Sequence, residues 1–239
     1  MRNDIVRRDF LGAVGAVLAA GAAADALAAQ PADQPAQPRA VKIVGIACSP
    51  RKGKTTAAAV QLCLDAAKQV SPIVEVELIE LAEMNINGSV AAGVALPAGQ
   101  ADDFQKLIPK LSDPKVAGVI VGSPVYFGGM SSLCKAFLDR CMAFRRNSFA
   151  LSNKVAGAVA VGGARNGGQE LTIQAIQAAL LCQEMIVVGD GKPSGRIGAT
   201  LLNGGNDDIS GDEFGVSTAR NLGRRVAEVA LRLSGMPKQ

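Results

Sequence analysis

Short apolar runs alternate with longer amphipathic segments along residues 41–233. Two of the runs, residues 116–122 and 154–161, contain almost no polar side chain. Runs of this length and composition are typical of strands that are buried on both faces of a parallel sheet. Further strands are expected over residues 41–47, 73–81 and 185–189. The alternation predicts an α/β fold in which a doubly wound, five-stranded parallel sheet carries helices on both faces.

Apolar residues at helical spacing fill most of the segments between these strands. They predict helices over residues 55–70, 131–144, 169–182 and 216–233. A shorter helix is expected to begin near Asp102 and to end before Pro114. The stretches 82–100 and 190–215 are rich in Gly and are predicted as loops. The pattern indicates no internal repeat and no second domain.

The N-terminal residues have the composition of an export signal. Arg7 and Arg8 precede an uncharged run rich in Gly and Ala, residues 12–24, and residues 26–28 supply a small-x-small pattern. Twin arginines before a weakly apolar run are the signature of a Tat signal. An Ala-rich helix of the domain and an uncleaved membrane anchor are alternatives, although the run is too short and too rich in Ala to predict a membrane span.

These features predict the organisation of the whole chain. We expect a Tat signal peptide over residues 1–28, a flexible linker over 29–40 and one folded domain over 41–239. We then expect export by the Tat route to the periplasm and no stable membrane span after signal cleavage.

The composition argues against several function classes. The chain has 239 residues and no His, which removes His-based general bases, catalytic triads and most zinc sites. The net charge is +4 and the basic residues are dispersed, so no nucleic-acid surface is expected. The cysteines form no C-x-x-C pair, and burial as small apolar residues is favoured over disulfides or a metal site. They are Cys48, Cys63, Cys134, Cys141 and Cys182.

The segment after the first strand, residues 49–56, has the residue types of a phosphate-binding loop. Its Gly53-Lys54-Thr55 matches the end of a P-loop, but the motif requires Gly where Cys48 stands. The segment opens a helix, and a helix N-terminus presents unpaired N–H groups to an anion. A helix cap with solvated basic side chains is the alternative. The candidate residues are Ser49, Arg51, Lys52, Gly53, Lys54, Thr55 and Thr56.

The segment after the third strand contains the only tyrosine of the chain, Tyr126, beside Phe127. The paired glycines that follow allow the backbone to approach a flat ring closely. The alternative is a turn in which the two aromatic rings cover the core. The candidate residues are Pro124, Val125, Tyr126, Phe127, Gly128 and Gly129.

The segment after the fourth strand, residues 162–168, is rich in Gly and can direct backbone N–H groups at a ligand. Its candidate residues are Gly162, Gly163, Arg165, Asn166, Gly167 and Gly168. In a doubly wound sheet, ligands bind at the carboxyl ends of the strands, where all three segments are expected. Together the segments predict one extended ligand that has a phosphate and a planar polar ring.

Three motifs carry a resemblance to a known family: SPRKGKTT at residues 49–56, PVYFG at 124–128 and GGARNGGQE at 162–170. Residues 135–140 and 185–190 add to it. The chain resembles the flavodoxin-like NAD(P)H-dependent FMN reductases and, within them, the iron-sulfur flavoproteins. The resemblance implies a flavodoxin-like fold with strand order 2-1-3-4-5, bound FMN, and a homo-oligomer such as a dimer or tetramer.

The resemblance also implies roles for the three segments. Ser49, Arg51, Gly53, Thr55 and Thr56 would hold the FMN phosphate. Residues 124–129 would contact the isoalloxazine and the ribityl chain, and residues 162–168 would bind the pyrimidine side of the ring. Arg165 is the candidate donor there, and no residue is expected to be catalytic in the narrow sense, because the flavin carries the chemistry.

One departure from the resemblance concerns the cluster. Iron-sulfur flavoproteins place a compact cysteine motif after the second strand, whereas residues 81–90 here contain no Cys. Cluster ligation needs thiolates, so no iron-sulfur cluster is expected.

The expected function is an FMN-dependent oxidoreductase that passes electrons from NAD(P)H, or from another donor, to a quinone, a flavin or a similar acceptor. A redox protein could serve as partner, because reduced nicotinamides are not expected in quantity outside the cytoplasm. A non-catalytic periplasmic electron carrier of the flavodoxin type is the alternative. An ATP- or GTP-binding switch rests only on Gly53-Lys54-Thr55.

Overall fold

The computed structural model of the protein describes residues 40–235. The predicted Tat signal and all but the last residue of the predicted linker lie outside these residues. A parallel sheet in the order β2-β1-β3-β5-β6 forms the centre of the described domain. Its strands are β1 (Val41–Ala47), β2 (Val74–Glu80), β3 (Val116–Tyr126), β5 (Val155–Gly162) and β6 (Ile186–Val187). In chain order of the predicted strands this is 2-1-3-4-5, so the predicted topology is confirmed.

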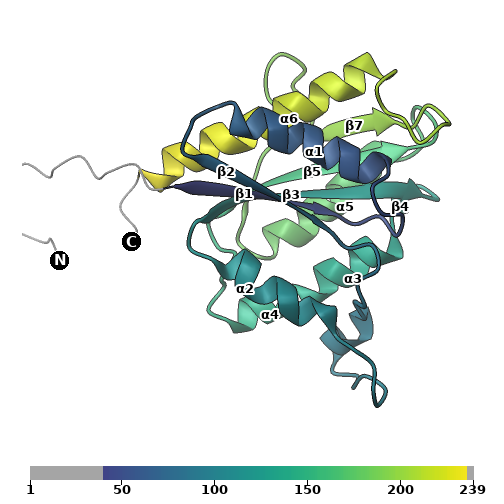
Figure 1. Ribbon diagram of the computed structural model, residues 1–239, viewed down its shortest axis with the longest axis vertical. Helices are drawn as coiled ribbons and strands as arrows, with labels where there is room; N and C mark the ends of the chain where they lie inside the picture. The colour runs from purple at the N-terminus through teal and green to yellow at the C-terminus, as the bar shows by residue number, and fades with distance from the viewer. Residues whose placement is uncertain (1–39, 236–239) are drawn as a thin grey trace, which may run out of the picture. The chain divides into compact units, whose positions relative to one another are not determined.

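Helices cover both faces of the sheet (Figure 1). One face carries α1 (Thr55–Lys68) and α6 (Glu213–Ser234), whose buried side chains include Val60, Leu64 and Leu222. The other face carries α2 (Leu107–Ser112), α3 (Ser132–Arg140), α4 (Met142–Arg146) and α5 (Gln169–Leu181). Its core holds the buried rings of Phe104, Phe137 and Phe144. The predicted doubly wound arrangement is therefore present.

Small residues bring α1 and α6 close together. A Cβ at Gly223 of α6 would overlap the backbone of Cys63 in α1, so only Gly fits there. Ala57, Ala219 and Ala227 lie in the same buried cluster. This packing explains how the domain builds a core with few aromatic residues.

The far edge of the sheet differs from the prediction. The expected strand at 185–189 pairs with β5 only at Ile186 and Val187, and a further strand, β7 (Ala199–Leu202), pairs with the other half of β5. Residues 190–196 leave the sheet between them, closed by a hydrogen bond from Asp190 N to Arg196 O (3.0 Å). The connection contains Pro193, which has no N–H for a strand ladder.

Two other predicted segments are more structured than expected. β3 runs on to Tyr126 and pairs with β4 (Gly129–Met130), so a hairpin replaces most of the predicted loop. The 82–100 loop contains the short 3-10 helix η1 (Gly88–Ala92), and a second one, η2 (Asp103–Lys106), precedes α2.

Two helix boundaries also differ from the prediction. The predicted helix over 131–144 divides at Cys141 into α3 and α4. α6 begins three residues earlier than predicted, because Asp212 caps it.

None of the helices within residues 40–235 combines the length and the apolar character that a membrane crossing requires.

Candidate functional site

The three candidate segments meet at the carboxyl edge of the sheet. Ser131, just after β4, donates a hydrogen bond from its hydroxyl to the Cys48 carbonyl (2.7 Å) and ties the hairpin to the first segment. The hairpin and the third segment touch backbone to backbone: a Cβ at Gly168 would lie 2.6 Å from the Cα of Gly128. The structure thus brings together residues that lie 83 positions apart in the chain, and it joins all three segments at one edge.

The first turn of α1 has no side-chain cap. Lys54 is the N-cap residue and makes no capping hydrogen bond, and Thr55 and Thr56 follow it with buried side chains. By contrast, Ser131 caps α3 and Asp212 caps α6. An uncapped N-terminus leaves N–H groups unpaired at the positive end of the helix dipole. The N-terminus of α1 therefore offers several N–H donors to an anion.

Two cations of the first segment meet one carboxylate. Arg51 donates to Asp207 (2.6 Å), and the ammonium group of Lys54 lies 3.3 Å from the same carboxylate. The hydrogen bond from Arg51, and then the one from Lys54, lowers the pKa of Asp207 below its ordinary value. Asp207 belongs to the connection between β7 and α6, which the sequence did not single out.

The other loop residues also contact acidic side chains. Lys52 pairs with Glu83 (2.8 Å) in a solvent-exposed ion pair, and this hydrogen bond raises the pKa of Lys52. The backbone N–H of Gly53 donates to the Glu80 carboxylate at the end of β2 (2.6 Å). Ser49, in turn, accepts a hydrogen bond from the Arg51 N–H (3.1 Å), which holds the turn. The segment has a defined shape before any ligand is considered.

The aromatic residues of the hairpin are at the surface. Tyr126 is 44% exposed and Phe127 is fully exposed, whereas Pro124 is buried. Phe127 has a φ of +49°, an unusual conformation for an aromatic residue. The alternative in which both rings cover the core is therefore wrong, and the rings are free to face a ligand or another protein.

Gln169, which is not among the predicted site residues, holds the third segment in place. Gln169, at the start of α5, is buried; its amide donates to Ala164 O (2.8 Å) and accepts from Gly167 N (3.0 Å). These bonds fix the shape of the loop while leaving Gly163 and Asn166 exposed. The signal was present in the sequence, since Gln169 is part of the GGARNGGQE motif.

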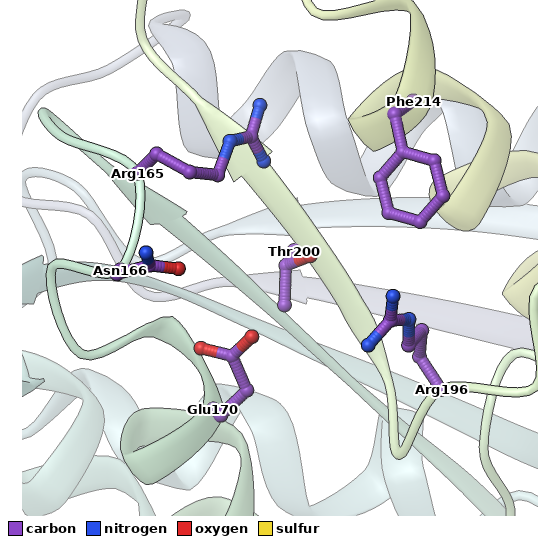
Figure 2. A pocket seen from close by; sticks show the side chains of 6 residues that line it. All are labelled: Arg165, Asn166, Glu170, Arg196, Thr200 and Phe214. Atoms are coloured by element: carbon purple, nitrogen blue, oxygen red, sulfur yellow. The ribbon is translucent and has the colours of Figure 1, made fainter.

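Arg165 points to the side of the loop that faces β7 and α6. Its guanidinium pairs with Asp212 (2.5 Å), the residue that caps α6. It lines a cavity of about 300 Å³ together with Asn166, Glu170, Arg196, Thr200 and Phe214 (Figure 2). Its predicted contact with a flavin ring stays a prediction.

The cysteines are mostly buried, as predicted. All five are free thiols, and only Cys182 is exposed. Burial raises the pKa of the Cys63 and Cys141 thiols, which keeps them protonated and unreactive. Within residues 40–235, no group of three or more His, Cys, Asp or Glu side chains is arranged to hold a metal ion.

Comparison with known proteins identifies relatives of the domain. An iron-sulfur flavoprotein of Methanocaldococcus jannaschii is 41% identical over 192 residues, which cover 79% of this chain and 97% of that protein. An NAD(P)H dehydrogenase (quinone) of Chromohalobacter salexigens is 30% identical over 177 residues, which cover 67% of this chain and 84% of that protein.

The fold and a family model agree with these relatives. A solved structure of a flavodoxin, WrbA-like protein from Agrobacterium tumefaciens is similar with a TM-score of 0.54 at 20% identity, over 80% of this chain and 97% of that chain, and shows the same fold. The family model described as NADPH-dependent FMN reductase matches residues 41–197. The chain therefore belongs to the family of NADPH-dependent FMN reductases and is an oxidoreductase with a flavodoxin-like fold.

Proposed function

We propose that the three segments bind FMN and that the protein passes electrons from NAD(P)H, or from another donor, to a quinone, a flavin or a similar acceptor. The observation that carries the proposal is the uncapped N-terminus of α1 beside Arg51 and Lys54. Backbone N–H groups and two cations form a site suited to a phosphate monoester. The phosphate would compete with Asp207 for these two cations.

The remaining segments suit a flat polar ring. The contact between Gly128 and Gly168 supports a common wall formed by the hairpin and the third segment. Gln169 holds the Gly-rich backbone in one shape, so that its N–H groups are preorganised as donors. FMN supplies the hydride and electron chemistry when it is bound. The protein residues then bind, orient and shield it, and no side-chain acid or base is required.

We propose that FMN is the only redox group that the protein binds and that it holds no iron-sulfur cluster. Several relatives are named iron-sulfur flavoproteins, but residues 81–102 of this chain contain no Cys. A cluster needs thiolate ligands, and within residues 40–235 no three or more His, Cys, Asp or Glu side chains are arranged to hold a metal ion. Iron and acid-labile sulfide assays of the purified protein test this point, and stoichiometric iron with sulfide would contradict it.

The cellular setting is also part of the proposal. The twin-arginine sequence supports export to the periplasm, where a redox protein could replace NAD(P)H as donor. The relatives named NAD(P)H dehydrogenase (quinone) favour an enzyme over a simple electron carrier.

We also propose that the protein forms a homo-oligomer, as the resemblance implies. Light scattering of the purified protein tests this point.

Anaerobic mixing of the purified, flavin-loaded protein with NADH or NADPH tests the activity. Rapid loss of the flavin absorbance, followed by its return when a quinone is added, is the expected result. Flavin that stays oxidised with either nicotinamide but accepts electrons from a reduced redox protein would support the electron carrier instead. A colourless protein that binds a nucleoside triphosphate would contradict both.

A further inference from the structure

The cavity of Figure 2 shares Arg165 and Asn166 with the proposed FMN site and extends away from it toward β7 and α6. Its volume of about 300 Å³ is at the lower end of the range of small-molecule sites. The segments that enclose it are the third loop, the start of α5, the connection between β6 and β7, β7 itself and the start of α6. The connection that leaves the sheet between β6 and β7 therefore forms one wall of this cavity.

Arg196 is placed in the cavity by a buried residue. The carboxylate of Asp190, which has no exposed surface, accepts a hydrogen bond from the Arg196 N–H (2.5 Å) and fixes the backbone there. The guanidinium lies over the ring of Phe214, 5.6 Å from its centroid. Among the described residues no carboxylate lies within ion-pair distance of Arg196. Its five donors are therefore available to a ligand.

The other lining groups complement this cation. Arg165 is already neutralised by Asp212, so Arg196 is the cation that remains for an anionic group. Glu170 and Asn166 offer hydrogen-bond acceptors and donors on the side of the third loop, with Thr200 between them and Arg196 (Figure 2). The ring of Phe214 is 48% exposed and provides an apolar face for stacking.

We propose that this cavity binds a flat aromatic compound that carries a negatively charged group, and that Arg196 selects for the charge. The identity of the ligand rests on the proposed function, because a compound beside the flavin would be its electron donor or acceptor. The same chemistry could come from the adenosine 2′-phosphate end of NADPH or from an anionic quinone. Guanidinium groups bind phosphate and carboxylate in a bidentate manner, which suits either source.

Calorimetric titration of the flavin-loaded protein with matched pairs of probes tests the proposal. One pair is adenosine 2′-monophosphate and adenosine; the other is anthraquinone-2-carboxylate and 2-(hydroxymethyl)anthraquinone. We expect the charged member of one pair to bind at least about tenfold more tightly than its neutral partner, from a single charge-assisted contact. Discrimination in the first pair assigns the cavity to a phosphorylated donor, and discrimination in the second assigns it to an anionic acceptor.

Three variants make the test specific. Arg196→Gln should abolish the discrimination, and Arg196→Lys should retain part of it. Arg146→Gln removes one exposed positive charge from α4, which contributes no residue to the lining of the cavity, and should leave the discrimination unchanged. Equal binding within both pairs, or discrimination that survives Arg196→Gln in a folded protein, would overturn the proposal.

Flavin content, measured on the same samples, separates this proposal from the proposed function. Protein that holds FMN but fails to discriminate contradicts the cavity alone. Protein without flavin that still discriminates contradicts FMN binding and supports the cavity.

Discussion

Thr56 lies in the uncapped first turn of α1 with a buried side chain, where the FMN phosphate is proposed to bind. Thr56→Asp should weaken FMN binding at least about 100-fold, because it sets a carboxylate against the phosphate and cancels about two charge-assisted hydrogen bonds. An acidic residue in the first turn interacts favourably with the helix dipole, which offsets part of the cost of burying its charge. Fluorescence titration with FMN measures the effect, and circular dichroism checks the fold.

Thr56→Val is the matched control, since it keeps the size and removes only the hydroxyl. Its loss of affinity should stay below about tenfold, as expected for one hydrogen bond. If the Asp variant bound FMN as tightly as the unaltered protein, the phosphate would have to lie elsewhere.

Individual site residues were predictable when they stood in a local pattern. The first segment, including Thr55 and Thr56, was predicted as a candidate because small, hydroxyl and basic residues follow an apolar strand, and its binding of a phosphate stays a prediction. Asp207 was not found, because it reaches Arg51 across 156 positions of the chain and only the fold brings the two together. The pairing of Arg165 with Asp212 escaped the sequence for the same reason.

The contact between the hairpin and the third loop depends on Gly168. It has a φ of +108°, and a Cβ there would lie 2.6 Å from the Cα of Gly128. Gly168→Ala should lower the free energy of unfolding by at least about 1–2 kcal/mol and weaken FMN binding, because the backbone conformation is strained and the two loops are forced apart. Chemical denaturation and FMN titration measure the two effects.

Gly163→Ala provides the control within the same loop. Gly163 has no positive φ, and no atom lies within 4 Å of the position of its Cβ. The change in stability should stay within about 0.5 kcal/mol. Equal effects of the two substitutions would show that the contact between the loops is unimportant.

The segment from η1 to η2 is held to α3 by a buried ion pair. Arg140 and Asp102 are 5% and 15% exposed at the side chain, and the guanidinium donates twice to the carboxylate. The hydrogen bonds from Arg140 lower the pKa of Asp102 below its ordinary value. Asp102→Asn should lower the free energy of unfolding at pH 7 by about 3 kcal/mol, because Arg140 is left as an unpaired buried charge.

The pH dependence of this loss follows from the direction of the shift. Because the native pKa is lowered, the stabilisation is complete above the unfolded value of about 3.9 and is lost as the pH falls through the native value. The difference between the unfolding curves of the two proteins should therefore begin to shrink below about pH 4 and should vanish only below the native pKa. Asp139→Asn, which breaks an exposed pair with Lys135, should have little effect at any pH. A difference that persists unchanged at low pH would contradict the assignment to Asp102.

The strands and helices were predictable where burial decides the pattern. β3 and β5 lie at the centre of the sheet. Their continuous apolar runs are typical of strands that are buried on both faces. β7 was missed because it is only four residues long and follows a Gly-rich connection, so its pairing with β5 is set by the tertiary fold. The end of β3 was predicted as a loop, because Pro124 and the paired glycines are typical of loops. In the structure these residues form a hairpin between β3 and β4.

The molecule as a whole follows from the alternation of strands and helices. A parallel sheet with helices on both faces gathers the strand ends at one edge, which is why segments from three parts of the chain meet there. The sequence could predict that the three segments meet at this edge, and the binding of FMN there stays a prediction. It could not predict the cavity behind the third loop, because Glu170, Arg196 and Phe214 belong to three different elements.

Binding of FMN and of riboflavin to the cofactor-free protein tests the central claim most directly, because the two ligands differ only in the phosphate. Fluorescence titration should find one FMN per chain, bound at least about 100-fold more tightly than riboflavin. Failure to bind either flavin, or equal affinities for both, would contradict a phosphate site at the start of α1.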